Sequence, residues 1–228
     1  MYKNVWKAHA GGCLMIVRIN REEDPNGRFE VLGSGFVCHN KGYILTCAHL
    51  INLTDELAVI PTTNIDSFNK MTIEKANCIT VSIAQFDPVN DLALLRLPNS
   101  NSVYLPFDIF HRGATPAVGS SVACLGYPFG NFGHHVLKIT GGIISSKVEN
   151  ENGTNQYQID AMIHESNSGG PLVDLTTNKI IGIVSGRFSP AGGQGGLMLG
   201  NYQVGSESSI GLAVTSQYAF ELLKAEGL

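Results

Sequence analysis

The sequence has few charged residues and no long apolar run, and each shortage excludes a class of protein. Charged side chains make up 15% of the 228 residues and the net charge is -4. No basic surface is therefore available for a phosphate backbone, and we expect no nucleic-acid partner. No apolar run approaches the roughly 18 to 20 residues that a bilayer-spanning helix needs, so we also expect no membrane segment.

Cysteines are scarce and irregularly spaced. Their number is odd, and they show neither the C-x-x-C pairs of a zinc site nor an even disulfide set. They are Cys13, Cys38, Cys47, Cys78 and Cys124. We therefore predict reduced thiols. The N-terminus lacks an apolar stretch followed by a small-residue cleavage site, which predicts no secretory signal and a cytoplasmic location, although a chain trimmed of its leader would look similar.

Short runs rich in Val, Ile, Leu, Phe and Tyr are separated by clusters of Gly, Asn, Asp and Pro, as is typical of strands and turns. Twelve such runs occupy residues 14–19, 29–38, 43–47, 57–60, 78–85, 92–97, 121–125, 136–146, 156–161, 172–173, 180–185 and 210–214. They favour an all-β sandwich or a pair of barrels over a βαβ design. Helix signals are confined to the tail, where Thr215 or Ser216 can cap a helix that ends before Gly227.

Two stretches lack strand periodicity. Residues 98–119 contain three prolines, which predicts the connection between an N-terminal domain, 1–105, and a C-terminal domain, 106–228. Residues 187–209 are rich in glycine and predict a long surface loop.

Ser168 stands in the segment Asn167-Ser168-Gly169-Gly170-Pro171, soon after an apolar strand. A serine hydroxyl becomes a useful nucleophile when a base removes its proton and N–H donors stabilise the oxyanion. Neighbouring glycines let the chain turn sharply, so that backbone N–H groups can converge on one point. We therefore predict Ser168 as a nucleophile, while the segment alone also fits a simple glycine turn.

Two further motifs supply partners for this serine. His49 ends the apolar strand that leads into Thr46-Cys47-Ala48-His49, and an imidazole can accept and return a proton at neutral pH. Asp91 opens a strand that is apolar at nearly every position. A carboxylate there is costly unless it has a partner, and a histidine N–H is one such partner. Taken alone, Asp91 also fits a turn cap.

The order of the three residues narrows the fold. His, then Asp, then Ser is the order in chymotrypsin, whereas α/β-hydrolases and subtilisins run differently. A cysteine nucleophile is a rival, but no cysteine occupies the glycine-flanked position. His134 and His135 are adjacent, and neighbours on a strand point to opposite faces, so we expect neither a metal site nor a cofactor.

With these motifs in this order, the sequence resembles the trypsin-like proteases, specifically the HtrA/Deg branch. The similarity runs from about residue 30 to residue 215. The segments that carry it are GSGF (33–36), YILTCAH (43–49), NDLA (90–93), GYPFG (126–130), GGIIS (141–145), IDA (159–161), NSGGP (167–171) and GIVS (182–185).

The resemblance implies two six-stranded antiparallel β-barrels of the chymotrypsin-like fold, followed here by a C-terminal helix. The first barrel would carry His49 and Asp91 and the second Ser168, with the cleft between them. The implied activity is serine endopeptidase action on a polypeptide through an acyl-enzyme. The resemblance also implies a homotrimer, for which Tyr2 and Trp6 are candidate contacts.

The resemblance further assigns an oxyanion hole and a substrate pocket. The hole would use the backbone at Ser166, Asn167 and Ser168. The pocket would be formed by Met162, Ile163, Ser185, Arg187, Gly211 and Ala213. No acidic residue lies at the position expected for the pocket floor, which predicts cleavage after small or medium aliphatic residues.

This chain departs from the family pattern before the nucleophile, where Ser166 replaces glycine and Glu165 replaces proline. A Cβ makes some backbone conformations expensive. Either Ser166 still presents its N–H inward, or the hole is collapsed until substrate binds. The alternative function is a weakly active or inactive protease fold that binds a polypeptide partner. We see no PDZ-like segment after the core, and we expect ordering of the 187–209 loop to act as a switch.

Overall fold

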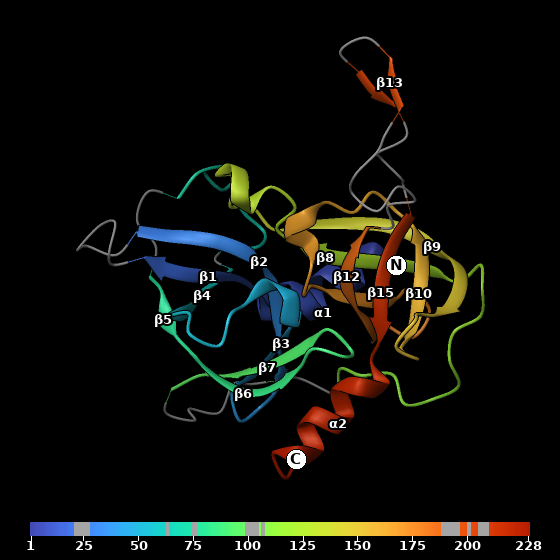
Figure 1. The fold of residues 1–228 in the computed structure, drawn as a ribbon, viewed down its shortest axis with the longest axis horizontal. Helices are drawn as coiled ribbons and strands as arrows, with labels where there is room; N and C mark the ends of the chain where they lie inside the picture. The colour runs from blue at the N-terminus through green and yellow to red at the C-terminus, as the bar shows by residue number, and fades with distance from the viewer. Residues whose placement is uncertain are drawn as a thin grey trace.

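The computed structural model describes residues 1–20, 28–62, 64–73, 77–98, 105, 108–187, 197–199, 202–204 and 210–228. Two antiparallel sheets lie side by side, the N-terminal one in blue to green and the C-terminal one in yellow to red (Figure 1). All twelve predicted runs form strands, with ends that shift by three residues or fewer. The predicted two-barrel architecture is confirmed, whereas the domain boundary at residue 105 stays a prediction.

The N-terminal sheet curls back on itself. Its strands are β1 (Cys13–Asn20), β2 (Arg28–His39), β3 (Tyr43–Thr46), β4 (Leu57–Pro61), β5 (Ile79–Thr80), β6 (Ser82–Asp87) and β7 (Leu92–Arg96), in the order β5-β4-β1-β2-β3-β7-β6. Only Val81 separates the two edge strands β5 and β6, so they are consecutive pieces of one run. Counted in this way, the sheet has the six strands that were predicted, one of them bent at Val81.

The C-terminal sheet is a closed barrel. It consists of β8 (Ser121–Gly126), β9 (Lys138–Glu149), β10 (Asn155–Asp160), β11 (Pro171–Asp174), β12 (Lys179–Arg187) and β15 (Ile210–Thr215), in the order β10-β15-β12-β11-β8-β9. A separate pair, β13 (Leu197–Leu199) and β14 (Tyr202–Val204), falls within the segment predicted as a loop. The loop prediction was wrong for these six residues, and the rest of 188–209 lies outside the described residues.

Three clusters of buried apolar side chains form the core. One fills the N-terminal sheet and includes Ile16 and Ile44. A second fills the closed barrel and includes Ile159 and Leu172. The third combines residues of both sheets with the C-terminal helix. Burial of one such side chain contributes about 1.5–3 kcal/mol. Because the third cluster contains side chains of both sheets, it holds the two barrels together.

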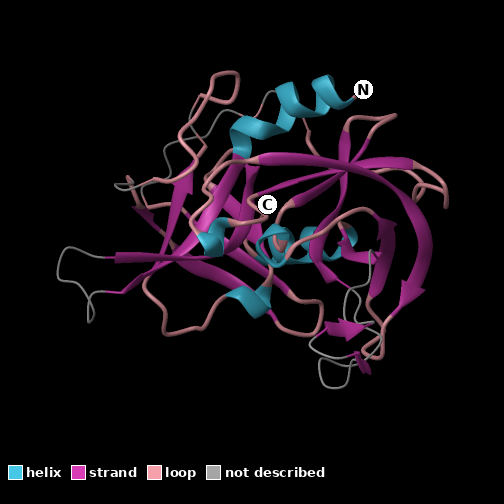
Figure 2. Cartoon of the chain, turned by 90° about the horizontal axis from the view of Figure 1, so that it is seen from above, coloured by secondary structure: helices cyan, strands magenta, loops and turns pink. Residues whose placement is uncertain are grey.

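The first helix, α1 (Tyr2–His9), contradicts the expectation that helix is confined to the tail. It packs on the C-terminal barrel, where the Tyr2 hydroxyl lies against Gly141 of β9 and the ring nitrogen Nε2 of His9 is 3.0 Å from the carbonyl oxygen of Asn178. Figures 1 and 2 together place α1 on the far face of the view in Figure 1. Its contacts form with residues far along the chain, which local sequence patterns do not reveal.

The second helix, α2 (Gln217–Ala225), confirms the predicted C-terminal helix, with Ser216 at its N-cap. It packs against the N-terminal sheet. Just beyond its last turn, the Glu226 carboxylate accepts hydrogen bonds from the Tyr43 hydroxyl at 2.8 Å and from the Gln85 amide at 2.7 Å. Each terminal helix therefore packs on the barrel built by the other half of the chain. Neither described helix combines the length and apolarity needed to cross a membrane.

We predict that His9 makes stability pH-dependent. Burial lowers the pKa of this histidine below its usual value, so below about pH 6.5 the unfolded chain binds more protons than the folded chain, and the free energy of unfolding falls. His9→Gln should weaken this dependence. Chemical denaturation at about pH 7.5 and about pH 5.5 should show a smaller stability difference for the variant than for the wild type; equal differences would contradict this role of His9.

Candidate active site

Two neighbouring strands bring His49 and Asp91 together. His49 lies in the 3-10 helix η2 (Ala48–Leu50), just after β3, and Asp91 directly precedes β7, with Thr46 opposite Ala93 in the pairing of these strands. The His49 ring nitrogen Nδ1 is 2.9 and 2.8 Å from the two oxygens of the Asp91 carboxylate. The His49 backbone N–H also donates to Asp91 Oδ1, at 2.9 Å. This pairing fixes the ring so that Nδ1 carries the proton and Nε2 can act as a base.

The Asp91 backbone supports this arrangement. Its φ of 55° lies in the left-handed region, which aspartate and asparagine tolerate better than most residues because their short polar side chains can hydrogen-bond locally. The Ala48 N–H donates to the Asp91 carbonyl oxygen at 3.2 Å. Backbone and side chain of Asp91 therefore both bind the segment that carries His49.

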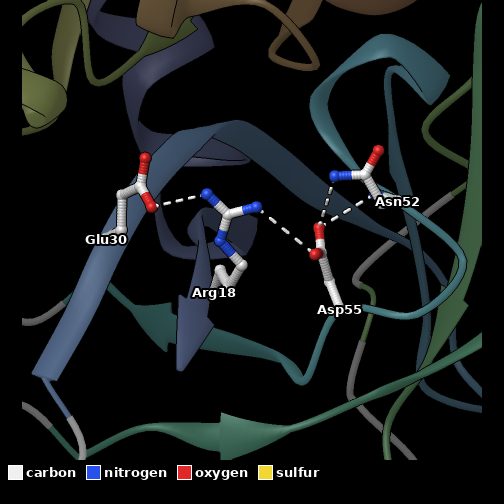
Figure 3. Close-up of polar contacts among 4 residues, drawn as sticks. All are labelled: Arg18, Glu30, Asn52 and Asp55. Carbon is white, nitrogen blue, oxygen red and sulfur yellow. Dashed lines mark hydrogen bonds and ion pairs between the residues drawn. The ribbon is translucent and has the colours of Figure 1, made fainter. Parts of the chain in front are cut away.

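The segment after His49 is fixed by a surface ion-pair network (Figure 3). Arg18 of β1 contacts Asp55 at 3.3 Å and Glu30 at 2.7 Å. Asp55 in turn accepts hydrogen bonds from the backbone and the side chain of Asn52. The Arg18–Glu30 pair is at the surface, where such pairs contribute about 0–1 kcal/mol. The Asp55 side chain is only 9% exposed, so its contacts to Arg18 and Asn52 orient the turn.

The turn that bears Ser168 packs against the strand that leads to His49. Ser168 follows the 3-10 helix η4 (Glu165–Asn167) and is 2% exposed. The Val184 carbonyl accepts hydrogen bonds from the Gly169 N–H at 2.7 Å and from the Cys47 thiol at 3.2 Å. Among the described residues, no hydrogen bond joins the Ser168 hydroxyl to the His49 imidazole. The structure therefore contains the His49–Asp91 pair but no hydrogen bond between His49 and Ser168.

Gly169 shows why the nucleophile segment requires glycine. Its φ is 86°, and a Cβ built there would overlap the Ser34 carbonyl oxygen and the Thr46 hydroxyl. Both the backbone conformation and the lack of space therefore exclude a side chain. Besides the convergence of N–H groups expected from the sequence, these glycines allow a close approach between the two barrels.

Ser34 connects every part of this site. Its N–H donates to the Ser168 carbonyl at 2.9 Å, and its hydroxyl donates to the Ser166 carbonyl at 2.7 Å. The Tyr127 N–H donates to the Ser34 hydroxyl at 3.0 Å, and the Thr46 hydroxyl donates to the Ser34 carbonyl at 2.8 Å. Ser34 lies in the GSGF segment (33–36), and its role in the site was not predicted from the sequence.

The backbone before Ser168 forms a hydrogen-bonded turn. The Asn167 N–H donates to the His164 carbonyl at 2.9 Å, so this donor is used within the turn here, and its assignment to the oxyanion hole stays a prediction. Ser166 lies in the 3-10 helix η4, and its hydroxyl donates to Asn131 Oδ1 at 2.9 Å. The two alternatives for the Ser166 N–H, inward or collapsed, stay predictions.

The residues assigned to the substrate pocket differ in burial, and the assignment stays a prediction. Met162 is 69% exposed between buried Ala161 and buried Ile163. Ile163 packs against Gly211, where a Cβ would lie 2.5 Å from Ile163 Cγ1. Ala213 is buried in the barrel.

Ser185 lies at an irregularity in the pairing of β12 with β15. Val184 and Gly186 pair with consecutive residues of β15, so Ser185 between them has no partner on that strand. Bulges of this kind are common next to active sites. The Ser185 hydroxyl oxygen is buried without a hydrogen-bond partner. Ser185 is therefore a good candidate for a substrate contact. Arg187 ends β12, and the placement of its side chain lies outside what the structure describes.

Cys47 is a residue that sequence reasoning did not assign. Among the described residues, Cys47, His49 and Asp91 form a group whose potential metal-ligand atoms lie within 4.8 Å of one another. Burial, and then the nearby Asp91 charge, raise the pKa of the Cys47 thiol well above its usual value. This thiol stays protonated at neutral pH, which argues against the rival cysteine nucleophile. All five cysteines are free, as predicted.

The family comparison agrees with this geometry. A family model described as "Trypsin-like peptidase domain" matches residues 33–183, a range that includes His49, Asp91 and Ser168. The chain belongs to the trypsin-like peptidase family. The predicted HtrA/Deg-like branch is confirmed as well, by the relatives and solved structures to which this family member is similar.

Curated relatives and solved structures resemble this trypsin-like peptidase over most of its length. A "Probable periplasmic serine endoprotease DegP-like" of Rickettsia conorii is 32% identical over 92% of the chain and 37% of the relative. One of Pseudomonas putida is 32% identical over 76% of the chain and 33% of the relative. The chain therefore spans about a third of these relatives. The structure titled "HtrA-type protease AlgW with decapeptide" matches 99% of this chain and 67% of that one, with a TM-score of 0.71 at 23% identity, which shows the fold alone.

The relatives overturn the cytoplasmic location expected from the sequence, because they are named periplasmic. The expectation rested on the first residues and on the cysteines. A chain that spans a third of its relatives carries no information about a leader in its first residues. Free buried thiols also do not distinguish compartments, since a disulfide needs two cysteines within bonding geometry.

We predict that Ser34→Ala destabilises the protein. The change leaves the Ser166 carbonyl and the Tyr127 N–H without the Ser34 hydroxyl, and each unpaired buried group costs about 1–3 kcal/mol. The free energy of unfolding, measured by chemical denaturation, should fall by about 2–4 kcal/mol. Ser145→Ala, on an exposed position of β9, is the control and should have almost no effect. A similar small effect for both variants would show that the Ser34 hydroxyl is dispensable.

Proposed function

We propose that this protein is a serine endopeptidase in which Ser168 is the nucleophile, His49 the general base and Asp91 the group that orients His49. The observation that carries the proposal is the pair of short contacts from His49 Nδ1 to the Asp91 carboxylate. It leaves Nε2 as the basic nitrogen of a side chain that is 46% exposed. Membership of the trypsin-like peptidase family supports the same assignment. So does the Val184 carbonyl, because it accepts hydrogen bonds both from Gly169 beside Ser168 and from Cys47 before His49.

The reaction follows from these roles. His49 Nε2 takes the proton of the Ser168 hydroxyl while Oγ bonds to the peptide carbonyl carbon. The C–N bond then breaks, His49 gives the proton to the leaving amine, and an acyl-enzyme remains. Water, deprotonated by His49, attacks the acyl carbon and releases Ser168. Asp91 stabilises the imidazolium and does not itself take the proton.

We predict that two substitutions separate these roles. Ser168→Ala should abolish peptide hydrolysis and covalent labelling by a fluorophosphonate, because no hydroxyl remains to react. Asp91→Asn should keep the fold, since asparagine tolerates positive φ, but should lower turnover about 10⁴-fold because the ring loses the partner that fixes its tautomer. Labelling and turnover of a casein or peptide substrate measure both effects.

The control for this experiment is Ser145→Ala, which should label and turn over like the wild type. Labelling of Ser168→Ala at the wild-type rate would place the nucleophile elsewhere. An Asp91→Asn variant with full activity would remove the orienting role of that residue.

The substrate class follows from the residues near the predicted pocket. Ile163, Gly211 and Ala213 are apolar, and none of the residues assigned to this pocket is acidic. We propose cleavage after small or medium aliphatic residues. A peptide-library digest analysed by mass spectrometry should show Ala, Val, Ile or Leu before most cleaved bonds. Cleavage mainly after Lys or Arg would show that another part of the chain forms the pocket floor.

A second candidate function is polypeptide binding with little or no hydrolysis. The Asn167 N–H, which is bonded within the turn, and the missing hydrogen bond between Ser168 and His49 favour it. A wild-type protein that binds peptides but resists fluorophosphonate labelling would support this candidate over the endopeptidase.

The relatives' names lead us to propose a periplasmic location for this chain. The homotrimer stays a prediction. Tyr2, one of its two candidate contacts, is 45% exposed on α1, and Trp6 packs in part against the core.

A further inference from the structure

A cavity of about 730 Å³ lies outside the proposed active site. It is lined from both halves of the chain, by Trp6 of α1, Met15 of β1, and residues of the segments 61–73 and 135–137. None of the three proposed catalytic residues lines it. Its volume falls in the range of about 300–1,000 Å³ that is usual for small-molecule sites. The cavity is therefore large enough to hold a ligand that takes no part in peptide hydrolysis.

Hydrogen bonds fix the wall that the segment 61–73 contributes. The His135 N–H donates to the Met71 carbonyl at 2.8 Å, and the Ile73 N–H donates to His135 Nδ1 at 3.0 Å. The Asn69 amide donates to two carbonyl oxygens of the same segment, at 2.9 and 3.1 Å. This wall is thus held in place before any ligand arrives, and a pre-formed site spares the ligand part of the entropic cost of binding.

The lining combines apolar surface with donors and carries no negative charge. Trp6, Met15 and Leu137 supply apolar side chains. Lys70 supplies an ammonium group, which has no hydrogen bond or ion pair with any described residue. Because His135 Nδ1 accepts the Ile73 N–H, the ring proton is on Nε2, which can donate to a ligand. No described residue that lines the cavity is acidic.

We propose that this cavity binds a small amphiphilic anion, such as a medium-chain carboxylate. The apolar chain of the ligand lies along Trp6, Met15 and Leu137, and its head group is bound by Lys70 and His135. The charge of the lining selects this class. A neutral ligand leaves the ammonium group without a partner, and a cation is repelled by it. The site is separate from the proposed endopeptidase function and does not depend on Ser168.

Trp6 provides a direct readout, because it is the one tryptophan of the chain. Titration with decanoate should shift its emission to shorter wavelength and reach saturation, since the alkyl chain displaces water from a partly exposed indole. Isothermal titration calorimetry measures the same affinity without this reporter. Decanol should bind more weakly than decanoate, and decyltrimethylammonium more weakly still. No binding of decanoate by either method, or binding without preference for the anion, would overturn the proposal.

A pair of lysine variants tests the head-group contact. Lys70→Met removes the ammonium group at the exposed mouth of the cavity and should weaken decanoate binding about two- to fivefold, with decanol unaffected. Lys224→Met, an exposed change on α2, is the matched control and should bind both ligands like the wild type. An equal loss of decanoate affinity in both variants would mean that only the net charge matters, and the assignment of Lys70 would be wrong.

A third variant tests the location of the chain. Val136 lines the cavity, and Val136→Phe fills part of it without adding a second tryptophan. If circular dichroism shows a folded variant, decanoate and decanol should both bind more weakly than to the wild type. Unchanged affinity would place the ligand elsewhere. A Trp6 signal that follows the protein concentration and not the ligand would make a second copy of the chain the occupant, against the proposal. These readouts do not involve catalysis, so their failure would leave the endopeptidase proposal unaffected.

Discussion

The active site depends on one buried serine of the N-terminal barrel. Ser34 uses its N–H, its hydroxyl and its carbonyl to join the nucleophile turn, the end of β8 and the strand that leads to His49. In a low-dielectric interior such bonds are strong, and each unmade one is costly. Because β2 and β3 are paired within one sheet, fixing the turn to Ser34 also fixes it relative to the imidazole. The distance between the proposed nucleophile and the proposed base is thus set across the interface of the two barrels.

The terminal helices reinforce the same interface from outside. α1 lies on the C-terminal barrel although it begins the chain, and α2 lies on the N-terminal sheet although it ends the chain. Separating the barrels would break the contacts of both helices together with the shared core cluster. Catalytic groups that come from two barrels need this rigidity, because misplacement by about 1 Å can cost about 10²-fold in rate.

Strands and the catalytic candidates were predictable because their signals are local. Apolar runs between glycine and asparagine turns gave all twelve predicted strands, and the order of His49, Asp91 and Ser168 matched one fold. The role of Ser34 was not predictable from spacing, since its four bonds join residues up to 134 positions apart in the chain. The exposure of Met162, at 69%, was not predictable either, since the resemblance that assigned it to the pocket carries no information on burial. α1 was missed because it is short and its buried face consists of only Val5 and His9, four residues apart, one of them a polar residue.

Ser166 is the position at which this chain departs from the family pattern, and its contacts are well defined. Its carbonyl accepts the Ser34 hydroxyl at 2.7 Å, and its own hydroxyl donates to Asn131 Oδ1 at 2.9 Å. The next residue is held as well, because the Asn167 N–H donates to the His164 carbonyl at 2.9 Å. Hydrogen bonds from both barrels therefore fix the turn, and the side chain at position 166 takes part in that bonding.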